Sequence, residues 1–113
     1  MHELSLMEAV REQALAQARA HGATRIAAIS LRIGSLAGVE PEALRFAHQV
    51  VMGGTAAEGA ALRIETVPAR FACEPCQQPF EAAQGDCFCP RCGACSRRLL
   101  QGRELELAAL DLT

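Results

Sequence analysis

The strongest constraint on this chain is a set of six cysteines, which all lie between residues 73 and 95 of a 113-residue sequence. Cys73 and Cys76 form one C-x-x-C motif, and Cys89 and Cys92 form a second, with twelve residues between the pairs. This spacing is typical of a tetrahedral zinc site, in which four thiolates hold one ion. A segment with so few apolar residues needs the metal to fold, so the sequence predicts a small structural zinc module.

Two further cysteines, Cys87 and Cys95, leave the choice of ligands open. The run C-x-C-x-x-C-x-x-C also permits other sets of four, such as Cys73, Cys76, Cys92 and Cys95. Disulfides and an iron–sulfur cluster are less favoured chemistries for the same residues. The start of the chain lacks the basic and apolar segments of a signal peptide, which predicts a cytoplasmic protein. In that reducing compartment, paired cysteines are expected to bind metal.

The segment before the cysteines contains two predicted helices. Apolar residues recur every three or four positions from about residue 4 to about residue 20, which predicts an amphipathic helix. Ser5 and Glu8 fit a capping box at its start. A second helix is expected to begin at Pro41, which suits a first helical turn, and to end at Gly53.

Alternating apolar and polar residues predict three strands, at 24–33, 62–66 and 103–112. We therefore expect an α+β fold, with a small sheet of about three strands, two helices and an inserted zinc-ribbon-like module. The cysteine segment lies between the second and third strands and has no clear periodicity. The predicted domains are a discontinuous α/β domain, residues 1–70 and 103–113, and a zinc domain, residues 71–102.

Charge and composition exclude several functions. Eleven arginines and thirteen acidic residues give a net charge of −2, which disfavours a dedicated nucleic-acid protein. No apolar run is long enough to predict a membrane span. The sequence has no phosphate loop, no HExxH motif and no nucleophile at motif spacing from a base, so we predict that it is not an enzyme. One function that these exclusions leave open is that of a zinc-ribbon nucleic-acid-binding or adaptor protein. This alternative rests on four arginines near the second motif, which could contact phosphates: Arg91, Arg97, Arg98 and Arg103.

His2 gives the amino terminus a possible chelating function. The α-amine of Met1, the backbone nitrogen of His2 and its imidazole could surround one ion with three coplanar nitrogens. Such a set suits Ni²⁺ or Cu²⁺, and Glu3 could complete it through a backbone nitrogen or its carboxylate. From the residues alone, however, a solvated terminal histidine is the favoured interpretation.

Several segments together resemble the HypA family of nickel-incorporation accessory proteins for [NiFe]-hydrogenase maturation. They cover essentially the whole chain: MHELSLMEAV, IGSLAGVEPEAL, GTAAEGAALRIE, CEPC and CPRCG. The resemblance implies a nickel metallochaperone that is not itself an enzyme, with Ni(II) as transient cargo and Zn(II) as a structural ion. By position, it implies nickel on Met1, His2 and Glu3. It also implies zinc on four cysteines: Cys73, Cys76, Cys89 and Cys92.

The resemblance also implies partner proteins. These are the GTPase HypB, the hydrogenase large-subunit precursor and, in some members of the family, urease accessory proteins. The sequence is compatible with a monomer or a homodimer. Cys87 and Cys95 are additional to the four expected zinc ligands, so the sequence leaves open whether they exchange into the zinc site or capture nickel.

Overall fold

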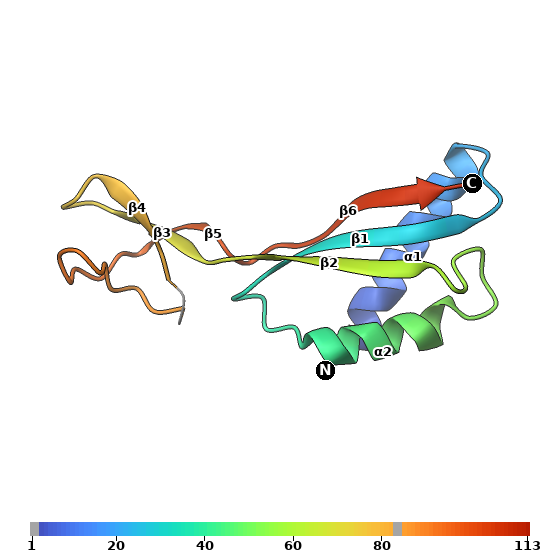
Figure 1. Cartoon of the computed structure of the whole chain (residues 1–113), viewed down its shortest axis with the longest axis horizontal. Helices are drawn as coiled ribbons and strands as arrows, with labels where there is room; N and C mark the ends of the chain where they lie inside the picture. The colour runs from blue at the N-terminus through green and yellow to red at the C-terminus, as the bar shows by residue number, and fades with distance from the viewer. Residues whose placement is uncertain (1–2, 83–84) are drawn as a thin grey trace. The chain divides into compact units, whose positions relative to one another are not determined.

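The computed structural model describes residues 3–82 and 85–113. Its elements follow one another as α1 (Glu3–Ala20), β1 (Ile26–Gly34), α2 (Pro41–Met52), β2 (Ala61–Val67), β3 (Arg70–Cys73), β4 (Gln78–Glu81), β5 (Arg98–Gln101) and β6 (Leu105–Leu112). Figure 1 shows these elements in chain order. The strands form two three-stranded sheets, with the orders β2-β1-β6 and β4-β3-β5. The predicted α+β class is therefore confirmed.

The chain divides into two units, which we name by their main features. The helical unit comprises Met1–Leu31, Val39–Glu65 and Glu106–Thr113, and the cysteine unit comprises Arg32–Gly38 and Thr66–Leu105. Neither helix in the described part of the chain is both long and apolar enough to cross a membrane.

Both predicted helices are present. In α1, the buried residues recur every three or four positions, and the buried apolar ones are Met7, Val10, Ala14 and Ala18. The helix already includes Glu3, so Ser5 lies inside it, and the predicted capping box does not mark its start. The second helix, α2, has Pro41 in its first turn and is followed by Gly53. The imidazole of His21 donates a hydrogen bond to the Gln17 carbonyl near the end of α1, 2.9 Å away.

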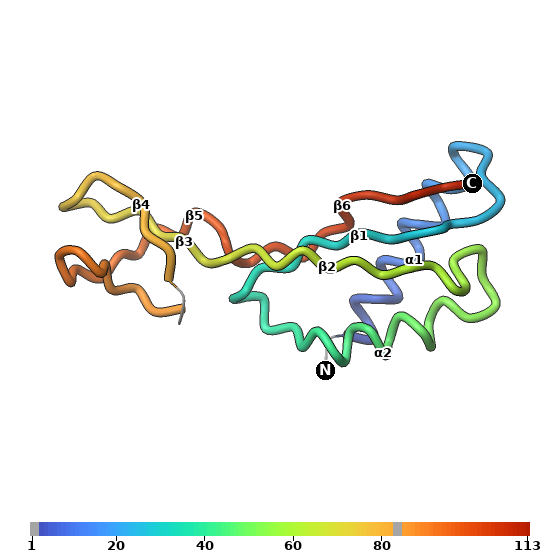
Figure 2. Tube along the Cα trace, viewed as in Figure 1, coloured from blue at the N-terminus to red at the C-terminus, as the bar shows by residue number. Residues whose placement is uncertain are grey.

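The strand β1 occupies the centre of the first sheet. Backbone hydrogen bonds join Ile26 to Ala56 and Ser35 to Val67, so β1 and β2 run parallel, and the segment that contains α2 connects them. Bonds from Gly34 to Glu104 and from Thr113 to Arg25 together show that β6 runs antiparallel to β1. Figure 2 shows the traces of β2, β1 and β6 side by side.

Burial along β1 changes phase between Ala28 and Ile29. Ile26 and Ala28 are buried, and beyond them the buried positions are Ile29, Leu31 and Ile33. The sequence shows the same shift, because the apolar residues of this strand do not follow one alternation. The largest fully buried side chains of the described residues all belong to the helical unit: Met7, Ile26, Ile29, Leu31, Leu44 and Met52.

The cysteine unit contains a sheet that the sequence pattern does not predict. The central strand β3 pairs antiparallel with β4, from Arg70 opposite Glu81 to Cys73 opposite Gln78. It also pairs antiparallel with β5, where Phe71 lies opposite Leu99. The rings of Phe71 and Phe80 stack with their centroids 5.8 Å apart. These strands therefore lie in a segment whose sequence has no clear periodicity.

Gly34 and Gly102 form a close backbone contact within the cysteine unit. A Cβ added to Gly34 would overlap the backbone of Gly102, and one added to Gly102 would lie 2.8 Å from the Cα of Ala69. Gly102 also has a φ of +129°, a backbone conformation that residues with a side chain rarely adopt. The close approach therefore requires glycine at both positions.

Candidate metal centre

The first C-x-x-C motif is held at the end of β3. Cys73 is the last residue of that strand, and a turn over residues 74–77 leads to β4. The Gln77 amide donates to the Glu74 carbonyl at 3.2 Å, and Gln77 has a φ of +55°. The pairing of β3 with β4 therefore brings Cys73 and Cys76 to one side of a tight turn.

The second motif lies at the tip of a short antiparallel ladder. Phe88 pairs with Cys95, and the Cys89 amide donates to the Ala94 carbonyl at 2.9 Å. The Gly93 amide donates back to the Cys89 carbonyl at 2.8 Å, and the φ of Gly93 is +77°. Glycine therefore eases this turn. Figure 2 shows the two loops that carry the motifs, one in yellow and one in orange.

The four sulfur atoms of the two motifs converge. Those of Cys73, Cys76, Cys89 and Cys92 all lie within 4.8 Å of one another. The Cys73 and Cys92 sulfurs are 3.5 Å apart, and the Cys76 and Cys89 sulfurs are 4.0 Å apart. Ligands about 2.3 Å from a tetrahedral zinc ion lie about 3.8 Å from one another. The donor set and its spacing therefore fit a zinc ion.

The four thiols influence one another's ionisation because they are so close. For Cys73, the Cys76 amide acts to lower the pKa, but burial and the neighbouring thiols outweigh it and raise the pKa to about 12. For Cys89, burial acts to raise the pKa, but the amides of Cys92 and Arg91 and the neighbouring thiols lower it to about 6. Four thiolates together would repel one another strongly, and a divalent cation removes that cost.

Arg91 adds positive charge beside this cluster. Its guanidinium donates hydrogen bonds to the Gln78 and Pro79 carbonyls, at 3.2 and 3.3 Å. A hydrogen bond to the Cys76 side chain raises the pKa of Arg91 above its usual value. The side chain is thus directed toward the thiols, which weakens the case for Arg91 as part of a phosphate-binding patch. Sequence spacing gives no signal for this role, because the contact joins residues on two different loops.

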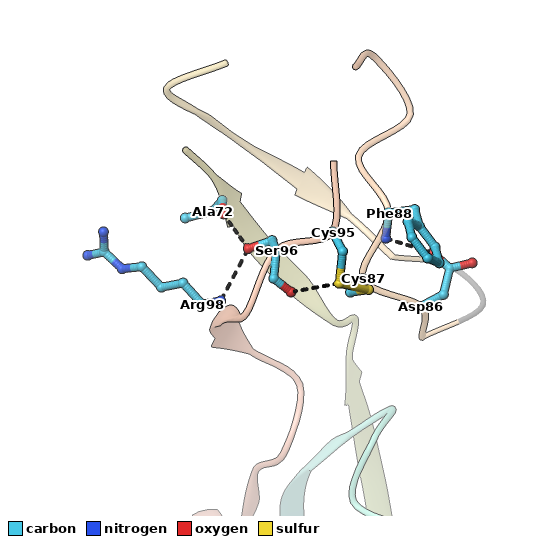
Figure 3. Close-up of a disulfide and its surroundings, with 7 residues drawn as sticks. All are labelled: Ala72, Asp86, Cys87, Phe88, Cys95, Ser96 and Arg98. Atoms are coloured by element: carbon cyan, nitrogen blue, oxygen red, sulfur yellow. Dashed lines mark hydrogen bonds between the residues drawn. A yellow bond between two sulfur atoms is a disulfide. The ribbon is translucent and has the colours of Figure 1, made fainter. Parts of the chain in front are cut away.

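The two additional cysteines form a disulfide in the structure. Cys87 and Cys95 are bonded, with their Cα atoms 4.8 Å apart. Figure 3 shows this bond beside Ser96, whose hydroxyl donates to the Ala72 carbonyl. The other four cysteines have free thiols. The disulfide therefore separates the six cysteines into a converging set of four and a bonded pair.

The predicted nickel site falls largely outside the described residues, because Met1 and His2 lie there. Glu3 is described: it is the first residue of α1 and only 6% exposed. One of its carboxylate oxygens accepts a hydrogen bond from the Glu40 amide at 2.9 Å. That bond is the main reason that the pKa of Glu3 is lowered to about 2. Glu3 therefore connects the first turn of α1 to the start of α2.

Comparison with known proteins decides the family. The family model described as "Hydrogenase/urease nickel incorporation, metallochaperone, hypA" matches residues 1–112. This chain belongs to the HypA family. A relative named hydrogenase maturation factor HypA, from Picosynechococcus sp., is 43% identical over 112 residues, which is 99% of each chain. Another with the same name, from Synechococcus sp., is 46% identical over 116 residues, again 99% of each chain.

Solved structures of HypA proteins share the fold. The solution structure of the Ni metallochaperone HypA from Helicobacter pylori matches with a TM-score of 0.71, covers 99% of this chain and 97% of its own, and is 21% identical. A second solution structure, of a HypA protein, has the same TM-score and 20% identity, and it covers 100% of this chain and 97% of its own. The resemblance read from the sequence motifs is thus confirmed, and the chain is a member of a metallochaperone family for hydrogenase and urease nickel incorporation.

Proposed function

We propose that this chain binds Ni(II) at its amino terminus and delivers it during maturation of [NiFe]-hydrogenase. The observation that carries the proposal is the match of the HypA nickel-incorporation family over residues 1–112, which includes the opening Met-His-Glu. The Met1 amine and the nitrogens of His2 are the proposed ligands, and Glu3 completes them through its backbone nitrogen or its carboxylate. Nickel accepts this nitrogen-rich, planar arrangement.

The anchoring of Glu3 supports a chelate at this end of the chain. The Glu40 hydrogen bond and the burial of Glu3 fix the residue that directly follows His2. A chelate on consecutive residues gains affinity when the next residue is already ordered, because less conformational entropy is lost on binding. The short ligand set also suits a chaperone, which must release its cargo to another protein.

We further propose that Cys73, Cys76, Cys89 and Cys92 hold a structural Zn(II) ion. The convergence of their sulfurs within 4.8 Å supports this assignment, as does Arg91, which offsets the charge of the thiolates. When bound, zinc would join the two loops and so stabilise the cysteine unit. A site with four protein ligands has no open position for a substrate, so we propose no enzymatic activity for it.

The partners we propose are those that the family resemblance implies. They are the GTPase HypB and the hydrogenase large-subunit precursor, and urease accessory proteins are a third class of partner to test. We propose that nickel delivery takes place in the cytoplasm and that the chain acts as a monomer or a homodimer.

Nickel titration of protein with a native Met1 tests the proposal. Three comparisons are needed: His2→Ala, a form with residues added before Met1, and His21→Ala as a matched control at an exposed position just after α1. We expect nickel binding in the native form and in His21→Ala, and its loss in the other two, with one zinc per chain throughout. Nickel binding that survives both changes at the amino terminus would contradict the site.

The pH dependence of nickel affinity is a second test of the same chelate. The ring of His2 and the Met1 amine must lose protons to bind nickel. Affinity should therefore fall as the pH falls from about 8 to about 6.5, the range of the amine and imidazole pKa values. A constant affinity across that range would exclude this ligand set.

A further inference from the structure

Cys87 and Cys95 flank the second C-x-x-C motif closely enough to form part of another ligand set. Cys95 is three residues after Cys92, so these two also form a C-x-x-C pair. That spacing lets two thiolates reach one ion. The chain thus carries a second possible set that shares three members with the first: Cys73, Cys76, Cys92 and Cys95.

The structure holds Cys95 on the same side of the unit as the first motif. Cys73 and Cys95 line one cavity of about 380 Å³. Ser96, which is only 8% exposed, donates its hydroxyl hydrogen bond to the carbonyl of Ala72, the residue before Cys73. Figure 3 shows this contact beside the disulfide. The backbone of Cys95 is therefore tied to the strand that ends in a metal ligand.

The disulfide removes Cys95 from the available ligands. Its sulfur is bonded to that of Cys87, whose carbonyl also accepts a hydrogen bond from the Ser96 amide at 2.7 Å. Cys95 is exposed, and Cys92 is the exposed member of the four free cysteines. Small thiols and disulfides in solution can thus reach the bonded pair, and an incoming ligand can approach the metal centre beside Cys92.

We propose that the Cys87–Cys95 pair is a redox switch that controls how fast zinc leaves the four-cysteine site. In the oxidised form, zinc has only the four ligands Cys73, Cys76, Cys89 and Cys92. In the reduced form, the Cys95 thiolate enters the zinc shell as another cysteine leaves, which provides a low-barrier route for exchange. This inference rests on the zinc site put forward under Proposed function.

The redox step needs a disulfide compound of low molecular weight as oxidant, such as glutathione disulfide. One protein thiolate attacks that disulfide and forms a mixed disulfide, with one small thiol released. The second protein thiolate then attacks the protein sulfur of the mixed disulfide, and the second small thiol leaves. The protein pair loses two electrons and two protons, which the two released thiols carry.

Zinc release to a chromogenic chelator tests the switch. Zinc-loaded protein is prepared in two forms, treated with glutathione disulfide or with a thiol-free phosphine reductant, and the disulfide is verified by the mass difference of two hydrogen atoms. We expect release from the reduced form to be about tenfold faster, equivalent to a barrier lower by about 1.4 kcal/mol. Equal rates in the two forms would overturn the proposal.

Two variants distinguish ligand exchange by Cys95 from a disulfide that acts only as a cross-link. Cys95→Ser and the double change Cys87→Ser with Cys95→Ser should release zinc slowly, like the oxidised protein, whatever the redox treatment. If they release it as fast as the reduced native chain, the disulfide acts as a structural cross-link, and the ligand-exchange proposal is wrong. Cys73→Ser tests the underlying site, because Cys73 belongs to both ligand sets: retention of one zinc per chain there, with slow release, would contradict the zinc ligands themselves rather than the switch.

Discussion

Side chains from α1, β1 and α2 fill the interior of the helical unit, whereas the buried cluster of the cysteine unit is much smaller. That cluster consists of Ala69, Cys73, Phe80, Ala82 and Cys89, so two of its five members are proposed metal ligands. Burial of aliphatic surface stabilises a fold by about 25 cal/mol per Å². The helical unit has large aliphatic groups to bury, and the cysteine unit has a small apolar cluster beside the four cysteines that we propose as zinc ligands. The two units should therefore respond differently to the same perturbation.

The largest expected effect is the loss of the metal. Cys73→Ser should abolish zinc binding and unfold the cysteine unit, because apparent zinc-binding energies of about 10–16 kcal/mol in small zinc modules exceed what so small a cluster supplies. Hydrogen exchange measures this for each unit separately: amides of β3 and β5 should lose protection, and those of α1 should keep theirs. If the amides of α1 also lost protection, the two units would unfold together, and the proposed difference in how they are stabilised would be wrong.

A core substitution should act on the helical unit instead. Leu44 is fully buried in α2, and Leu44→Ala should lower the free energy of unfolding by about 2–5 kcal/mol. The matched control is Phe46→Ala on the same helix, because Phe46 is large and apolar but 68% exposed, and its loss should change stability by less than about 0.5 kcal/mol. Urea unfolding followed by helix circular dichroism measures both.

Zinc content sharpens that comparison. It should stay at one ion per chain in both variants, since neither residue belongs to the cysteine unit. A destabilisation by Phe46→Ala as large as that by Leu44→Ala would indicate that Phe46 covers part of the core.

The smallest effect expected is a pH dependence confined to the helical unit. His48 is 7% exposed, and its Nε2 has no hydrogen-bond partner among the described residues. Burial, and then the charge of Arg45, lower the pKa of His48 below its ordinary value of 6.5. The unfolded chain therefore takes up the proton first, and the stability that neutral His48 provides is complete above about pH 6.5 and declines below it.

Variants at two histidines isolate this contribution. His48→Gln should remove part of the decline in the urea midpoint below pH 6.5, while His21→Gln, at an exposed position, should leave it in place. An unchanged pH profile in His48→Gln would mean that the imidazole becomes charged without disturbing the fold.

Strong local patterns make most of the helical unit predictable. The apolar repeat of α1 and Pro41 at the start of α2 define both helices to within a few residues. The sheet of the cysteine unit escapes prediction because β3, β4 and β5 have only four residues each, and β4 contains Pro79. Pairings such as Arg70 with Gln101 join residues far apart in the sequence, so no local pattern reports them.

The two candidate sites, the four-cysteine cluster and the amino terminus, are predictable from the sequence to different extents. The spacing of the two C-x-x-C motifs predicts a four-thiolate site, but other sets of four also fit that spacing, and the structure shows which four sulfurs converge. The pairing of Cys87 with Cys95 cannot be read in this way, since several ligand sets fit the same spacing. At the amino terminus, the residues permit a chelate that suits Ni²⁺ or Cu²⁺, and the family resemblance selects nickel. The bond between Glu3 and Glu40 is not predictable from local sequence, because it depends on a contact between two helices.

The pairing of Arg70 with Gln101 has a consequence for how such a chain can evolve. The chain enters the inserted sheet and leaves it at neighbouring positions, and the side-chain amide of Gln101 also reaches the Pro68 carbonyl at 2.9 Å. A segment whose two ends lie next to each other can be inserted into a fold as a self-contained unit. It can lengthen, shorten or exchange its loops while the gap that the flanking strands must bridge stays the same. Selection can thus change the cysteine-bearing segment without redesigning the strands that flank it.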